Sequence, residues 1–190
     1  MAHVCPWWFV RSFDNPIRRW FHDPDEIFGS SVRLGMHVLD VGCGAGFNTE
    51  GLARLVGSEG RVVAVDLQPR MLAMTERRLK RSGLVDRVEL VEAQVDDLGI
   101  ESQAHFDFAV AFWMAHEVED LGRFFRQLRD AMEPGASLLI CEPKLHVTGP
   151  AFERSVRAAL RAGFRASERP AIALSRAALL TRAERSQADG

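Results

Sequence analysis

The chain has 190 residues, of which 47% are hydrophobic and 26% charged, and its formal net charge is −2. This composition is typical of one globular domain with a sizeable core, and it gives no electrostatic reason to expect a nucleic-acid or membrane partner. No stretch approaches the roughly 20 apolar residues that span a bilayer, and the first residues lack the apolar core of a signal peptide. Three widely spaced cysteines argue against a disulfide framework. We therefore expect a soluble, cytoplasmic protein.

Residues 1–35 form an aromatic-rich leading segment that contains Trp7 and Trp8. Asn15-Pro16 has the order of an N-cap residue followed by proline at the first helical position, and Asp23-Pro24 repeats this signal. We expect two short helices here, the second ending at Gly29, packed as a cap on the main domain.

From Met36 onward, short apolar runs alternate with segments of helical periodicity. This alternation predicts parallel βαβ units in a doubly wound, mostly parallel, seven-stranded sheet, with its last two strands as an antiparallel hairpin at one edge. We expect the domain to span residues 36–180, followed by a frayed tail over 181–190. The predicted strands are 37–41, 61–66, 88–91, 106–112, 136–142, 164–168 and 171–179.

Four helices are predicted between these strands. They run over 46–56, from Pro69 to Gly83, over 119–132 and from about Phe152 to Gly163. Leu121, Phe124, Phe125, Leu128 and Met132 give the third of them the clearest period in the chain. Pro134-Gly135 is expected to stop that helix.

A glycine-rich turn follows the first predicted strand and opens the first helix after it. Its glycines stand at 42, 44 and 46, and the next strand ends in Asp66. This arrangement is half of a nucleotide-type site, for a dinucleotide or for S-adenosylmethionine. The dinucleotide spacing would require a third glycine at Phe47, and the chain has no tyrosine to act as a dehydrogenase acid. An NAD(P)-dependent oxidoreductase is therefore the less favoured alternative.

Four ordered motifs resemble those of the class I S-adenosylmethionine-dependent methyltransferases, in particular the small single-domain, type 11-like members. They are Asp40-x-Gly42-x-Gly44-x-Gly46, the strand-ending Asp66, the stretch Asp96-Asp97-Leu98, and the run over 128–136 that leads into the fifth strand. The resemblance covers about 36–180. It implies a Rossmann-like methyltransferase fold, S-adenosylmethionine as cofactor and S-adenosylhomocysteine as product.

The resemblance also implies a cofactor-binding role for particular residues. Asp40 would shape the turn, and Asp66 would accept hydrogen bonds from both ribose hydroxyls. Either Gln94 or Asp96 would make the polar contact to adenine. The turn residues Gly42, Cys43, Gly44, Ala45 and Gly46 would lie against the methionine half, Leu67 and Met71 would pack on adenine beside Val95, and Phe112 and Trp113 would border the sulfonium.

The methyl acceptor should lie beyond the carboxyl ends of strands one, four and five, which are neighbours in the family's strand order. Candidate catalytic groups there are His116, Glu117 and His146, because a histidine titrates near pH 7 and can remove an acceptor proton. Glu142 is a candidate acceptor-binding residue or an orienting partner for a histidine. Trp7 and Trp8 would cover the acceptor as an aromatic lid.

Cysteine chemistry is a further alternative, in which thiolates hold a metalloid or thiol acceptor. Cys43 and Cys141 should lie roughly 10 Å apart, since one strand separates theirs at about 4.8 Å per strand, so such a site would need Cys5 as well. We expect no metal. The sequence thus predicts methyl transfer to a small-molecule acceptor by in-line displacement. A catalytically silent cofactor-binding subunit is the alternative.

Overall fold

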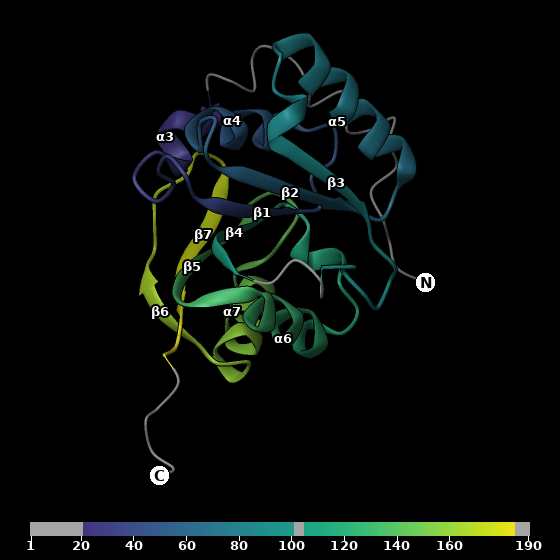
Figure 1. The fold of residues 1–190 in the computed structure, drawn as a ribbon. Helices are drawn as coiled ribbons and strands as arrows, with labels where there is room; N and C mark the ends of the chain where they lie inside the picture. Colours follow the sequence, from purple (N-terminus) through teal and green to yellow (C-terminus); the bar gives the residue numbers. More distant parts are fainter. Residues whose placement is uncertain (1–20, 101–104, 185–190) are drawn as a thin grey trace.

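The computed structural model describes residues 21–100 and 105–184, which form a seven-stranded sheet of order β3-β2-β1-β4-β5-β7-β6 (Figure 1). β5 pairs antiparallel with β7, and β7 with β6, whereas the other neighbours are parallel. This arrangement confirms the expected fold class and edge hairpin. The strands are β1 (His37–Val41), β2 (Arg61–Asp66), β3 (Val88–Glu92), β4 (Phe106–Phe112), β5 (Met132–Pro143), β6 (Phe164–Glu168) and β7 (Ser175–Arg182).

Helices cover both faces of the sheet (Figure 1). Alternate strand residues point to opposite faces, so Val38 and Val62 belong to one apolar cluster and Leu39 and Val63 to the other. One face carries α3 (Pro24–Phe28), α4 (Phe47–Leu55) and α5 (Pro69–Ser82); the other carries α6 (Leu121–Ala131) and α7 (Gly149–Arg161). The 3-10 turns η1 (Val85–Arg87) and η3 (Ala115–Glu117) complete the described elements. None of the described helices is long and apolar enough to cross a membrane.

Two predicted strand boundaries are wrong. β5 begins at Met132, because that residue already pairs with Phe106; Pro134-Gly135 lies inside the strand, at a register shift, and does not stop the helix. β7 begins at Ser175, because Leu174, at φ +57°, turns the chain just before it. β7 also extends two residues into the segment that was expected to be frayed.

The second helix of the leading segment is confirmed as α3. The Asp23 carboxylate accepts a hydrogen bond from the backbone N–H of Asp25 at 3.0 Å, and Gly29 is the C-cap. Phe28 is fully buried and contributes to the apolar cluster on that face of the sheet. The helix expected after Asn15, together with Trp7 and Trp8, lies outside the described residues.

The parallel pairing brings the carboxyl ends of four strands to one edge of the sheet. Val41 is level with Val65 on β2 and Ala111 on β4, and the strands continue to Asp66 and Phe112. Phe112 in turn is level with Cys141, the residue before Glu142 on β5. The carboxyl ends of β1, β2, β4 and β5 therefore meet, as the sequence predicts for the site.

Candidate active site

The turn after β1 requires glycine at three positions. Gly42, Gly44 and Gly46 have φ of +69°, +56° and +77°, a left-handed conformation that other residues rarely adopt. A Cβ atom on Gly42 would lie 2.8 Å from the Cβ of Met114, and one on Gly46 would lie 2.7 Å from the Thr75 Cγ2. A side chain at any of the three glycines would therefore strain the backbone, and one at Gly42 or Gly46 would also collide with its neighbours.

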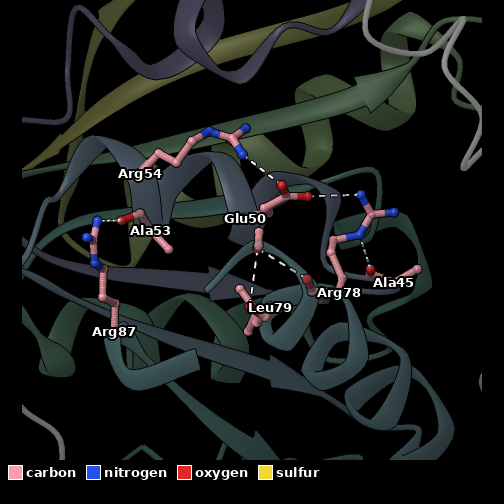
Figure 2. A network of polar contacts seen from close by, with 8 residues as sticks. Ala45, Glu50, Ala53, Arg54, Arg78, Leu79 and Arg87 are labelled. Carbon is pink, nitrogen blue, oxygen red and sulfur yellow. Dashed lines mark hydrogen bonds and ion pairs between the residues drawn. The ribbon is translucent and has the colours of Figure 1, made fainter. Parts of the chain in front are cut away.

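Side chains of α5 hold the same turn in place from behind. The Thr75 hydroxyl donates to the Gly44 carbonyl at 2.9 Å, and the Arg78 Nε donates to the Ala45 carbonyl at 2.9 Å. Glu50 accepts from Arg78 at 3.1 Å and from Arg54 at 2.8 Å, so the arginine is anchored to α4 as well (Figure 2). Sequence reasoning gave neither Thr75 nor Arg78 a role. The available signal was a polar pair at i, i+3 facing a glycine turn.

Two buried polar side chains flank the turn. Asp40 is 1% exposed and accepts a hydrogen bond from the Thr49 hydroxyl at 2.6 Å, which fixes the start of α4 to the end of β1. Asn48 is buried at the wall of a cavity that the glycine turn and Asp66 also border. Its Oδ1 has no hydrogen-bond partner in the part of the chain that the structure describes. A buried acceptor without a donor is costly, so Asn48 Oδ1 is suited to an N–H donor from a ligand. Sequence reasoning missed this residue.

The Asp66 carboxylate lies at the end of β2 with one edge against the turn. Its Oδ2 accepts from the Gly44 N–H and its Oδ1 from the Gln68 N–H, both at 2.9 Å. Burial raises the pKa of Asp66, although hydrogen bonds from the Gln68, Gly44 and Leu67 backbone oppose this rise. Each carboxylate oxygen has a second lone pair, so both can still accept bonds from a diol.

The remaining residues expected around the cofactor also line this cavity. Met71 is buried at its wall, and Leu67 is exposed at its rim. Gln94, Val95 and Asp96 form an exposed turn after β3, in which the Gln94 N–H donates to the Asp97 carbonyl at 2.7 Å. Both candidate polar contacts to adenine thus border the same space.

Aromatic rings close the cavity where β4 ends. Trp113 has φ +61°, its backbone N–H donates to the Cys141 carbonyl at 2.7 Å, and its indole donates to Ser175 Oγ at 3.0 Å. His22, which is 2% exposed, packs edge-on against Phe112 and Trp113 at centroid distances of 5.4 and 5.0 Å. These contacts fix both rings beside the glycine turn.

A histidine and a buried glutamate form a pair on the other side of the cavity. Glu142 is 0% exposed; one of its oxygens accepts from the His116 backbone N–H at 2.8 Å, and the other lies 2.7 Å from the His116 Nδ1. With Nδ1 donating to Glu142, the His116 Nε2 is the nitrogen free to act as a base. Glu142 does not line the cavity, which favours an orienting role over contact with an acceptor.

Two further residues surround the His116 ring. Glu117 Oε1 lies 3.9 Å from the His116 Nε2, and the exposed His146 ring packs edge-on at a centroid distance of 4.9 Å. Burial lowers the pKa of His116, but the hydrogen bond and charge of Glu142, together with the charge of Glu117, outweigh burial and raise this pKa. The structure thus brings all three predicted catalytic residues together.

The described cysteines are poorly suited to thiolate chemistry. Burial and the nearby charges of Asp40 and Asp66 raise the pKa of the Cys43 thiol well above its ordinary value, so the thiol stays protonated at neutral pH. Cys141 is fully buried among apolar side chains. No cluster of three metal-ligating side chains occurs over residues 21–100 and 105–184. Cys5 lies outside the described residues.

One cavity of about 950 Å³ joins the glycine turn, Asp66, Asn48 and His116. Ligand sites for small molecules and cofactors span roughly 300–1,000 Å³, so the space accommodates a cofactor together with a small partner. The unpartnered Asn48 oxygen, the carboxylate of Asp66 and the glycine-rich turn fit the amine, the ribose diol and the sulfonium-linked methionine chain of S-adenosylmethionine. The sheet order and this turn define a Rossmann-like methyltransferase fold.

Comparison with protein families gives the same result. Residues 38–135, just over half of the chain, match the family described as "Methyltransferase domain". The chain belongs to this family, within the class I S-adenosylmethionine-dependent methyltransferases that its motifs resemble. Membership confirms S-adenosylmethionine as the expected cofactor.

Individual relatives extend the comparison. The ubiquinone/menaquinone biosynthesis C-methyltransferase UbiE of Idiomarina loihiensis is 33% identical over 113 residues, which are 60% of this chain and 45% of that protein. The chain thus spans about half the length of the curated relatives it matches. A SAM-dependent methyltransferase from Aquifex aeolicus has a TM-score of 0.84 at 24% identity, covering 94% of this chain and 100% of its own. The [4+2]-cyclase SpnF has a TM-score of 0.66 at 20% identity, covering 78% and 59%. At these identities, both structures show the fold alone.

Proposed function

We propose that this chain transfers the methyl group of S-adenosylmethionine to a small-molecule acceptor, with His116 as the general base. The observation that carries this proposal is the position of the His116–Glu142 pair in the same cavity as the glycine turn and Asp66. When bound, the cofactor supplies an electrophilic methyl group together with its own leaving group. The protein must therefore align the acceptor, exclude water and remove a proton from the acceptor.

The proposed cofactor site runs from the turn to β3. Asp66 would bind the ribose diol, Asn48 Oδ1 would accept from the amino group, and Met71 and Leu67 would pack on adenine. The polar contact to adenine would come from Gln94 or Asp96. Phe112 and Trp113 would confine the methyl donor, because the packing of His22 fixes both rings.

The proposed acceptor lies between Trp113 and His116 and is apolar, with one ionisable proton. Besides the residues assigned to adenine, two exposed apolar side chains border the cavity: Leu145, next to His146, and Leu174, next to the Ser175 that bonds Trp113. This rim favours an apolar acceptor, and a histidine base is useful only if the acceptor has a proton to lose. A hydroxyaromatic compound meets both conditions, and the Idiomarina relative is named for a step of ubiquinone/menaquinone biosynthesis, which also concerns small molecules.

We also propose that Trp7 and Trp8 contact the acceptor. The described chain starts at Phe21, and its neighbour His22 already packs on cavity-lining rings and bonds the Ala173 carbonyl at 2.8 Å. The described chain therefore begins beside the cavity, which supports the proposal of an aromatic cap.

Product formation tests the proposal. The purified chain with S-adenosylmethionine should release S-adenosylhomocysteine in the presence of hydroxyaromatic acceptors, and His116→Ala should abolish this release while retaining cofactor affinity. Cofactor binding without turnover over a broad acceptor panel would favour the silent-subunit alternative. Binding of NAD(P) without binding of S-adenosylmethionine would favour the oxidoreductase alternative.

A further inference from the structure

A groove of about 430 Å³ lies between α6 and α7, which run side by side on one face of the sheet (Figure 1). Four arginines line it over a floor of small residues that includes Gly122 and Ala158. The arginines are Arg126, Arg154, Arg157 and Arg161. The groove shares no lining residue with the cofactor cavity, so it is a separate site.

The spacing of the arginines places them in a row. Arg154, Arg157 and Arg161 occur at i, i+3 and i+7 on α7 and therefore share one face of that helix. The seven residue steps from the first to the last span roughly 10 Å at about 1.5 Å per step. Arg126 reaches the same groove from α6, where its Nη1 would lie 3.3 Å from a Cβ atom on Gly122.

No carboxylate forms an ion pair with this row within the described residues. The groove lining contains no acidic residue, and none of its four arginine side chains makes a hydrogen bond or ion pair with residues 21–100 or 105–184. Nearby arginines behave differently, since Arg129 pairs with Asp130 at 2.6 Å and Arg169 with Glu153 at 3.1 Å. Four like charges on one groove repel each other, and a bound anion would relieve that repulsion.

We propose that this groove binds a small anion that carries two or more phosphoryl groups. A guanidinium is a planar fork that matches phosphate oxygens bidentately, and a row of about 10 Å accommodates a short chain of such groups. Acidic residues limit the length of the ligand. Asp120 Oδ1 would lie 3.3 Å from the same Cβ position on Gly122, and Asp130 follows at the other end of α6. A long nucleic-acid strand would meet these carboxylates, so the charge pattern favours a short oligophosphate.

Titration calorimetry of the full chain with tripolyphosphate at low salt tests this proposal. Saturable binding with one site is expected, and the double variant Arg157→Gln/Arg161→Gln should weaken it at least about tenfold, because each lost charged hydrogen bond is worth that much. Arg77→Gln removes an exposed arginine of α5 and serves as the matched control, with an expected change under about twofold. The dissociation constant of S-adenosylhomocysteine should be unchanged in all variants.

A single variant covers the case in which the double variant fails to fold. Arg157→Lys keeps the charge but loses the fork, so an intermediate weakening of tripolyphosphate binding is expected. Absence of binding at low salt, or equal weakening in Arg77→Gln, would overturn the proposal. So would tighter binding of a 12-nucleotide RNA than of tripolyphosphate with the same loss in the double variant, since that result would assign the groove to a nucleic-acid strand.

Discussion

Glu142→Gln is the sharpest test of the proposed base, because both glutamate oxygens bond the same residue. A glutamine keeps one oxygen acceptor and presents an NH₂ donor in place of the other. If the amide oxygen faces the His116 backbone N–H, the NH₂ group faces Nδ1, and the ring can accept that bond only in the tautomer with its proton on Nε2. Nε2 is the atom proposed to remove the acceptor proton, so the base is lost. If the amide is flipped, the backbone N–H is left without an acceptor.

The expected magnitudes follow from these two bonds. Turnover should fall about 10²- to 10⁴-fold, the usual contribution of a general base. Unfolding free energy should fall by about 1.5–3 kcal/mol, the value of one hydrogen bond to a charged group. The affinity for S-adenosylhomocysteine should be unchanged, because Glu142 does not line the cavity.

Steady-state kinetics over pH, calorimetry with S-adenosylhomocysteine and chemical denaturation measure these three quantities. Glu117→Gln is the matched control, since Glu117 lies 3.9 Å from the His116 Nε2 without a hydrogen bond to it and should cost less than about tenfold in turnover. Equal turnover in Glu142→Gln and the parent enzyme, without the loss of unfolding free energy expected for a flipped amide, would refute the assignment of His116 as the base. Equal losses in both variants would show that the charge of the site matters and the tautomer does not.

Five further results are expected. Asp66→Ala should weaken S-adenosylhomocysteine binding by about 1.5–3 kcal/mol in calorimetry, and unchanged affinity would contradict its role at the ribose. In the parent, this affinity should decline on acidification at a higher pH than for an exposed aspartate, because burial raises the pKa of Asp66 and only the carboxylate accepts both hydroxyls. Gly46→Ala should lower the free energy of unfolding by about 1–3 kcal/mol through its left-handed φ and its contact with Thr75, and a variant as stable as the parent in urea would argue against the turn geometry. Arg78→Met should weaken the binding of S-adenosylhomocysteine by about 0.5–1.5 kcal/mol and leave the maximal rate unchanged, with Arg77→Met as control. A fall in the maximal rate with unchanged binding would place Arg78 elsewhere in the mechanism. Because the pKa of His116 is raised, its stabilising contribution should be complete below about pH 6.5 and be lost as pH rises through that pKa, whereas a His116→Gln variant should lack this slope in denaturation curves.

The fold was predictable because periodicity and turn chemistry agree along most of the chain. The interiors of the strands before the helices are mainly apolar, as in Val62-Val63-Ala64-Val65 of β2, which is typical of buried parallel strands, and Pro69 and Gly83 mark both ends of α5. The errors occurred where a tertiary pairing overrides a local signal. Pro134-Gly135 is a strong breaker, yet the pairing of Met132 with Phe106 draws the residues before it into β5.

The site was predictable to the extent that motifs mark its backbone. The positions of the turn and of Asp66 follow from glycine spacing and a strand-ending acid, whereas their support by Thr75 and Arg78 depends on how α5 packs against the turn. Asn48 is one polar residue in a helix, and no pattern distinguishes it from a surface position. The bond between His116 and Glu142 joins residues 26 positions apart; the sequence left Glu142 with two possible roles and two possible histidines, and the packing beside the β4–β5 pair selects His116.

The burial of Glu142 is itself an argument for a role in the chemistry. A carboxylate that is 0% exposed costs several kcal/mol in lost hydration, and an apolar residue of similar size at such a position is often equally stabilising. Here both oxygens serve one histidine of the cofactor cavity, and an apolar side chain at this end of β5 could not orient that ring. A Glu142→Met variant that retains full stability but loses turnover would show this division between folding and function directly. One that unfolds while its turnover per folded molecule is unchanged would show the reverse.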